Sequence, residues 1–108
     1  MRVRLIKHFK CSFSEQNYMV ARHGNLPITP FIGLQIDVRE KNKESVIEYV
    51  VKRVIVSFDE EDLVCVIVEP LEPEEENFAS QSELSARIKQ YVDGGWELDD
   101  LLASALGL

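Results

Sequence analysis

Apolar side chains change their spacing along this chain, from every second residue in its first part to every third or fourth residue near its end. A spacing of two is typical of a strand with one buried face, and a spacing of 3.6 is typical of an amphipathic helix. Residues 31–39 alternate throughout, and residues 3–13 alternate except at Ile6 and Lys7, which indicate a bulge or cover on both faces. The chain is therefore expected to form a sheet first and helices afterwards.

Two more strands are predicted by runs of β-branched, aromatic and aliphatic residues. Residues 46–58 exceed the usual strand length, which predicts a bend or bulge that lets one strand serve two parts of a curved sheet. Residues 63–68 are apolar at every position, and Pro70 ends this strand because proline lacks the amide donor that the ladder needs. Both strands are expected to be covered on two faces, so another layer must lie against the sheet.

The last part of the chain carries helical spacing. Ser80 and Glu83 have the separation of a capping box at the start of a helix. The apolar stripe that follows consists of Leu84, Ile88, Tyr91 and Val92. Gly94 and Gly95 end this helix, because glycine accepts the left-handed conformation there. A second helix is predicted from Glu97, with a stripe of Leu98, Leu101, Leu102, Ala105 and Leu106.

These elements predict an α+β fold, with a four- to five-stranded antiparallel meander followed by a C-terminal helical hairpin packed on the sheet. A sheet curled into a small barrel is the alternative. A chain of 108 residues has room for one core, so a single domain is expected. We assign the antiparallel sheet to residues 1–71, an acidic linker to residues 72–79 and the helical hairpin to residues 80–108. Residues 14–30 are expected to be a long excursion with a short strand at most.

Charge is divided sharply between the two halves of the chain. Residues 1–54 carry a net charge of +5 and residues 55–108 a net charge of −12, for −7 overall. The negative total argues against general binding to nucleic acid or to an anionic membrane, which both need a basic surface. The division instead predicts another protein as the partner, either a basic protein or a second copy of this chain docked head to tail.

Two observations predict a cytoplasmic protein. No apolar segment near the first residue reaches the length of a signal peptide, and the longest apolar run, residues 63–68, is far too short to cross a bilayer. The two cysteines, Cys11 and Cys65, lack the spacing of a redox or metal motif, so free buried thiols in a reducing compartment are expected.

No catalytic, cofactor or metal motif stands out, so the protein is expected to be no enzyme and to need no cofactor or metal. His8 and Cys11, which are close in sequence, project to opposite faces of a strand and cannot share one ion there. The acid clusters lie in turns that water reaches, and neither a nucleophile elbow nor a glycine-rich phosphate loop is present. An enzyme whose site forms only in the fold, around His23 and an acid, is the alternative left open.

The predicted function is a small non-catalytic protein-interaction or regulatory module that acts through its charge-divided surface. Acidic proteins from mobile elements or bacterial defence systems can mimic the charge of DNA, which is a further hypothesis for the acids. A nucleic-acid-binding protein that uses the basic face of the first strand is the alternative. The candidate interaction residues are Arg2, Arg4, His8, Lys10, Tyr18, Arg22, His23, Glu74, Glu75, Glu76 and Trp96.

Overall fold

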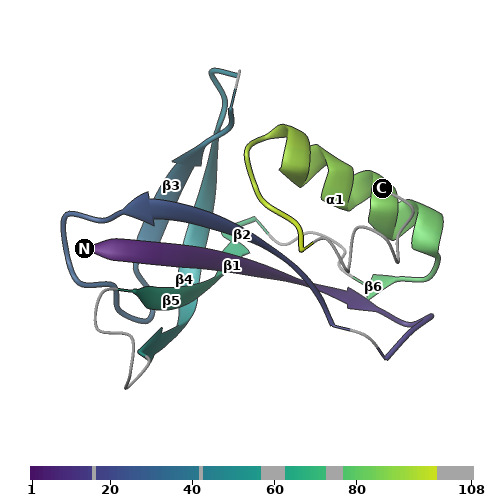
Figure 1. The fold of residues 1–108 in the computed structure, drawn as a ribbon, viewed down its shortest axis with the longest axis horizontal. Coiled ribbons are helices and arrows are strands. Elements are labelled where there is room, and N and C mark those ends of the chain that lie inside the picture. The colour runs from purple at the N-terminus through teal and green to yellow at the C-terminus, as the bar shows by residue number, and fades with distance from the viewer. Residues whose placement is uncertain (16, 42, 57–62, 73–76, 100–108) are drawn as a thin grey trace.

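The computed structural model describes residues 1–15, 17–41, 43–56, 63–72 and 77–99. These ranges form a curled sheet with a helix against its inner side (Figure 1). The elements are β1 (Arg2–Cys11), β2 (Tyr18–Asn25), β3 (Gln35–Arg39), β4 (Val46–Val56), β5 (Val64–Pro70), β6 (Asn77–Phe78) and α1 (Gln81–Asp93). The described part of the chain contains no helix that is long and apolar enough to cross a membrane.

The order of strands in the sheet is β2-β1-β5-β4-β3, with β6 beside the end of β1. β1 and β5 pair in parallel, with Ile6 opposite Ile67, while the other neighbours on this path pair antiparallel. The predicted antiparallel meander is therefore wrong, although the α+β class and a mostly antiparallel sheet are confirmed. The sheet curls into a half-barrel in which β2 and β3 remain separate edges (Figure 1).

β5 takes the central place in this sheet because its residues are apolar on both faces. Val66 and Val68 are fully buried on the inner face. Ile67 lies on the outer face, between Ile6 and Arg53 on the neighbouring strands. A strand of this kind loses most at an edge, where water would meet both its side chains and its backbone groups. Because β1 and β5 are far apart in sequence, their parallel pairing needs no tight turn.

β4 contains the irregularity that its length predicts. Its register with β5 shifts between Val51 and Arg53, which leaves Lys52 as the extra residue of a bulge. The predicted cover on both faces of this strand is wrong, since the outward side chains of Val46 and Ile55 are 47 and 39% exposed. The bulge instead lets β4 follow the curl of the sheet while its outer face meets water.

β2 is a full strand of eight residues, where the sequence predicts a short strand at most. Tyr18 and Val20 point inward and are buried, opposite Phe9 and Lys7 of β1. The second half of β2 is polar and contains Gly24, which is why it resembles a loop in sequence. Pairing of its whole length with β1 nevertheless holds it in the sheet, because a ladder satisfies backbone groups whatever the side chains are.

α1 begins and ends where the sequence predicts. The Ser80 hydroxyl accepts a hydrogen bond from the Glu83 amide at 3.3 Å, so the predicted N-cap is confirmed. At the other end, the Gly94 amide donates to carbonyls of the last turn, and Gly95 takes the positive φ of 107° that redirects the chain. A side chain at Gly95 would also come within 3.1 Å of the Lys41 Cβ, so Lys41 would have to shift to admit one.

The predicted helical hairpin is wrong. Glu97, the predicted start of the second helix, forms a bridge with Ala21 and exchanges two backbone hydrogen bonds with it, at 2.9 and 2.7 Å. The chain therefore leaves α1 as an added edge beside β2, with Trp96 buried and Leu98 packed against the core. Residues 100–108, which hold the rest of the predicted second helix, lie outside the described residues.

The core lies between the inner face of the sheet and α1. Leu84 and Ile88 of the helix are fully buried in the same cluster as the strand residues, which confirms the predicted contact between the helical stripe and the sheet. Val92, predicted in the same stripe, is 40% exposed instead. Tyr91 completes the contact, with its ring centre 5.3 Å from that of Phe9. Because each fully buried aliphatic side chain contributes about 1.5–3 kcal/mol, this stripe is what holds the helix.

Lys7 is a fully buried charged side chain within this core. β1 pairs with β2 without a bulge, so Lys7 points inward with Leu5 and Phe9, while Ile6 points outward. The Lys7 ammonium donates to the His8 carbonyl oxygen at 2.8 Å and lies 4.8 Å from the centre of the Phe9 ring. Ile6 is only 8% exposed, so the break in alternation reflects cover on both faces, one of the two predicted explanations.

Candidate functional site

The outer face of the sheet gathers basic side chains from β1, β2 and β4. Even-numbered residues of β1 point outward, and the register places His23 directly opposite Arg4 on the same face. Arg53 of β4 joins this face two strands away, across Ile67 and Ile6. These outward side chains, called the basic face below, are Arg2, Arg4, His8, Lys10, His23 and Arg53.

The basic face is short of acidic partners within the described ranges. His23 alone has one there, with its Nδ1 3.8 Å from the Glu97 Oε2. The Nε of Arg4 is buried and has no hydrogen-bond partner among the described residues. A buried guanidinium N–H without an acceptor costs stability, so Arg4 is held in the sheet without a compensating acid among the described residues.

Within the basic face, the pKa of His8 is lowered, because burial disfavours the charged imidazole and the Lys7 ammonium repels it. As the pH falls through about 6.5, the unfolded chain therefore takes up this proton before the folded protein does. The stability linked to His8 is present above pH 6.5 and is lost as the pH falls through the folded-state pKa. We expect His8→Gln to flatten the acid-side decline of the urea midpoint slightly, and an unchanged decline would contradict this.

The connection between β2 and β3, residues 26–34, presents apolar side chains to solvent and is called the apolar connection below. β3 begins at Gln35, later than predicted, because Gly33 at a φ of +94° turns the chain before the strand. Ile32, which the alternation places in the core, is therefore exposed to solvent. The exposed side chains are Ile28, Phe31 and Ile32, with exposed fractions of 50, 55 and 71%.

The apolar connection adjoins basic residues at both of its ends. The amide of Leu26 donates to the carbonyl of Met1 at 2.9 Å, directly before Arg2 of the basic face. The amide of Gly33 donates to the carbonyl of Val51 at 2.8 Å, directly before the bulge of β4 and its two exposed cations. Exposed apolar side chains rimmed by charge are the composition of a protein-binding surface.

A groove of about 280 Å³, called the seam below, lies between the free edges of β2 and β3. Its charged lining residues are Arg22, Asp37 and Arg39. Its apolar lining residues are Leu26 of the apolar connection and, from the inner face of the sheet, Val3, Leu5, Ile36 and Val38. Gly24 of β2 faces the same side as Val3, and a side chain built there would meet no atom within 4 Å. The seam therefore holds open space beside β2.

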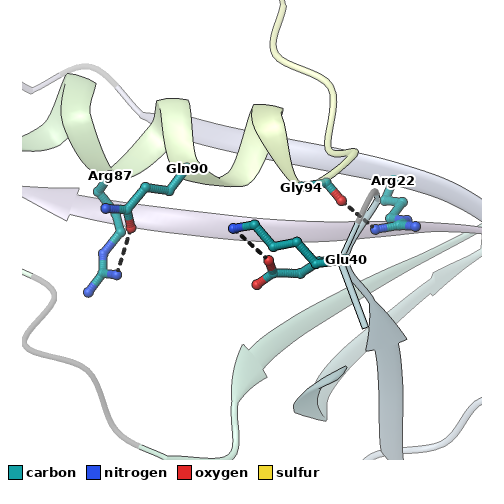
Figure 2. Close-up of polar contacts among 6 residues, drawn as sticks. Arg22, Glu40, Arg87, Gln90 and Gly94 are labelled. Atoms are coloured by element: carbon teal, nitrogen blue, oxygen red, sulfur yellow. Dashed lines mark hydrogen bonds and ion pairs between the residues drawn. The ribbon is translucent and has the colours of Figure 1, made fainter. Parts of the chain in front are cut away.

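One end of the seam is closed by the turn after α1. The Gly94 carbonyl accepts a hydrogen bond from the Arg22 Nη1 at 3.0 Å (Figure 2). It also accepts one from the Lys41 amide at 2.8 Å. This carbonyl ties the edge of β2 to the residues that follow β3. In the same view, the Glu40 carboxylate pairs with the Lys43 Nζ at 3.2 Å, close to the turn. The apolar connection joins the two strands at the other end of the seam.

The candidate residues from the sequence fall in different places. Tyr18 and Trp96 are each 4% exposed, so they belong to the core and not to a surface. Arg22 and His23 line the seam, and His23 also belongs to the basic face with the β1 cations. The acidic triplet lies outside the described residues and consists of Glu74, Glu75 and Glu76.

Three features of this site are missed by sequence reasoning: Arg39, the open space at Gly24, and the exposure of the apolar connection. Strict alternation from residue 31 onward predicts that Ile32 points into the core. Gly33 inside that run is the one local signal of a turn, because an isolated glycine in a strand pattern marks a backbone irregularity. The groove itself leaves no sequence signal, because it depends on which strands remain edges.

The described residues include no group of three His, Cys, Asp or Glu side chains that could hold a metal ion. Cys11 and Cys65 are free thiols of intermediate exposure. The side chains of His23 and Glu97 are 48 and 74% exposed, so this pair lacks the desolvation by which catalytic acids and bases are tuned. An enzyme with a site near His23 therefore stays a hypothesis without geometric support.

No protein-family model matches this chain, and no curated protein or solved structure is significantly similar to it. The functional argument therefore rests on three surfaces, which are the basic face, the apolar connection and the seam. They are contiguous, because the apolar connection begins beside Arg2 and joins the two strands that border the seam.

Proposed function

We propose that this protein is a non-catalytic binding module that recognises an acidic region of another protein through the basic face and the apolar connection. The junction of the two surfaces carries the proposal, since Leu26 pairs with the residue that precedes Arg2. Unmatched cations beside exposed apolar side chains suit a protein partner. Charge speeds and orients the encounter, while desolvated apolar contacts supply most of the affinity.

Nucleic acid is the competing partner, because phosphates would match the same cations. One observation favours a protein. Two of the three exposed apolar side chains of the apolar connection, Ile28 and Ile32, are aliphatic, so they offer a nucleic acid neither a hydrogen bond nor a ring on which a base could stack. The sequence also predicts a basic partner for the acidic second half of the chain. More than half of the carboxylates on which that prediction depends lie outside the described residues.

Charge reversal on the basic face is expected to weaken this binding steeply. Affinity capture from a nuclease-treated native lysate identifies the partner, and the purified partner is then titrated by calorimetry. We expect Arg4→Glu to weaken binding by about tenfold at low salt and by less at high salt, because salt screens the attraction between the basic face and an acidic partner. Phe31→Ser should weaken binding at every salt concentration, because it removes apolar contact area.

Lys89→Glu is the matched control, since Lys89 is exposed on α1 and undergoes the same change of charge. An equal loss of affinity in this control would show that net charge alone decides binding. Nucleic-acid binding would replace the proposal if the partner is captured only from lysate without nuclease treatment and the protein also retains an oligonucleotide. Self-association that depends on Arg4 and Phe31 would instead identify a second copy of this chain as the partner.

A further inference from the structure

β2 leaves unpaired backbone groups along the seam. In an antiparallel ladder, every second residue turns its N–H and C=O to the same side. Ala21 bonds to Glu97 on the side away from β1, so His23 and Asn25 present their backbone groups on that side too. Beyond the bridge at Ala21, no backbone partner within the described residues takes up these groups.

β3 presents backbone groups from the opposite side of the seam. The Glu40 amide donates to the Ser45 carbonyl, toward β4, whereas the Lys41 amide donates to the turn after α1, away from β4. Asp37 and Arg39 share the orientation of Lys41, because each lies an even number of residues before it. Within the described residues, two strand edges with unpaired donors and acceptors therefore border one groove.

The groove between these edges suits an extended chain with acidic side chains. The inner-face residues of the lining are apolar, and Gly24 leaves open space where any other residue would place a side chain. Arg22 and Arg39 outnumber Asp37 among the charged lining residues, so the seam attracts negative charge. Unselective pairing with other sheets is discouraged, because β3 has only five residues and carries charged side chains.

We propose that the seam binds an extended acidic segment of the partner protein, which enters as an added β-strand between β2 and β3. The backbone of the segment pairs with both edges, and its inward side chains contact the apolar lining. Its outward acids face Arg39 and His23. This inference rests on the proposed function, because the segment belongs to the same acidic partner, and it assigns that partner a second contact through its backbone.

Short fluorescent peptides, titrated with the full chain and followed by anisotropy, test this inference. The panel alternates Glu with Val, Ile or Thr, and matched peptides carry Lys in place of Glu. A third set carries N-methyl groups on alternate amides, which removes the donors for pairing. We expect saturable binding of the acidic peptides, about tenfold weaker binding of the Lys peptides, and loss of binding on N-methylation.

Three variants locate the bound peptide. Gly24→Leu fills the open space, so peptide affinity should fall by about tenfold or more while the urea midpoint stays near that of the wild type. Arg39→Glu should weaken binding of the Glu peptides and strengthen binding of the Lys peptides, because it reverses the charge that faces them. Arg53→Glu is the control, because Arg53 lies on the basic face and does not line the seam. It should leave peptide affinity unchanged.

No binding of the acidic peptides, or binding that N-methylation and Gly24→Leu leave unchanged, would overturn the inference. Weakening by Arg53→Glu but not by Arg39→Glu would place the peptide on the basic face and overturn it too. Such failures are separate from the proposed function, which survives if the whole partner still binds with its dependence on Arg4 and Phe31. Displacement of the bound peptide by an oligonucleotide would also overturn the assigned occupant. Displacement by a second copy of the chain that inserts one of its own strands would overturn it as well.

Discussion

We expect Trp96→Ala to lower the free energy of unfolding by about 3–5 kcal/mol, because it leaves a cavity in the core that its neighbours cannot fill. Trp96 is 4% exposed, and its ring centre lies 5.6 Å from that of Tyr49 and 5.8 Å from that of Tyr91. It thereby joins β4 to the end of α1. Urea unfolding followed by circular dichroism measures the loss, since the variant lacks the only tryptophan of the chain.

Trp96→Phe is the matched control for this prediction. It keeps an aromatic ring against Tyr49 and Tyr91 and removes less volume, so its cost should be clearly smaller than that of Trp96→Ala. A loss below about 1 kcal/mol for Trp96→Ala would contradict the burial of this side chain. It would also revive the hypothesis from the sequence that Trp96 is an exposed anchor for a partner.

Elements that depend on neighbouring residues could be predicted from the sequence. The hydroxyl of Ser80 and the amide of Glu83 are three residues apart, so the start of α1 is a local feature of the sequence. The stripe at Leu84 and Ile88 is equally local. The bulge of β4 follows from a run of apolar residues that is too long for one straight strand.

The order of the strands could not be predicted in the same way, because strand order depends on contacts between distant residues. The parallel pairing of β1 with β5 brings Ile6 beside Ile67, and no local pattern in either strand records it. The apolar character of β5 on both faces is the signal that excludes an edge position. This apolar character argues against a meander, because β5 would be its last strand and would therefore lie at an edge.

The candidate site combines predictable and unpredictable parts. The alternation of Arg2 and Arg4 with apolar residues predicts an outward basic row, and the register confirms that both project from one face of β1. The seam could not be predicted, because no local pattern in the sequence shows which strands will lie at the edges of the sheet. Its open space exists because Gly24 faces the inner side of β2, which lies at the edge of the sheet that the described residues form.

Lys7→Glu is expected to lower the free energy of unfolding by about 4 kcal/mol or more, because it buries a carboxylate among groups arranged for a cation. Lys7 and its cross-strand partner Val20 are both fully buried. The substitution replaces a donor to the His8 carbonyl with an acceptor, and it turns a negative charge toward the face of the Phe9 ring. Urea unfolding at neutral pH measures the loss.

Lys7→Met separates the sign of the charge from the packing of the side chain. Methionine has a similar length and no charge, so it keeps most of the packing beside Phe9 and Val20 and should cost clearly less than Lys7→Glu. Acidification should narrow the gap between the two variants, because the introduced carboxylate no longer buries a charge once it is protonated. Equal losses for the two variants at neutral pH would mean that the sign of the charge at this position does not matter. That outcome would contradict the contacts of the Lys7 ammonium with a carbonyl oxygen and a ring face.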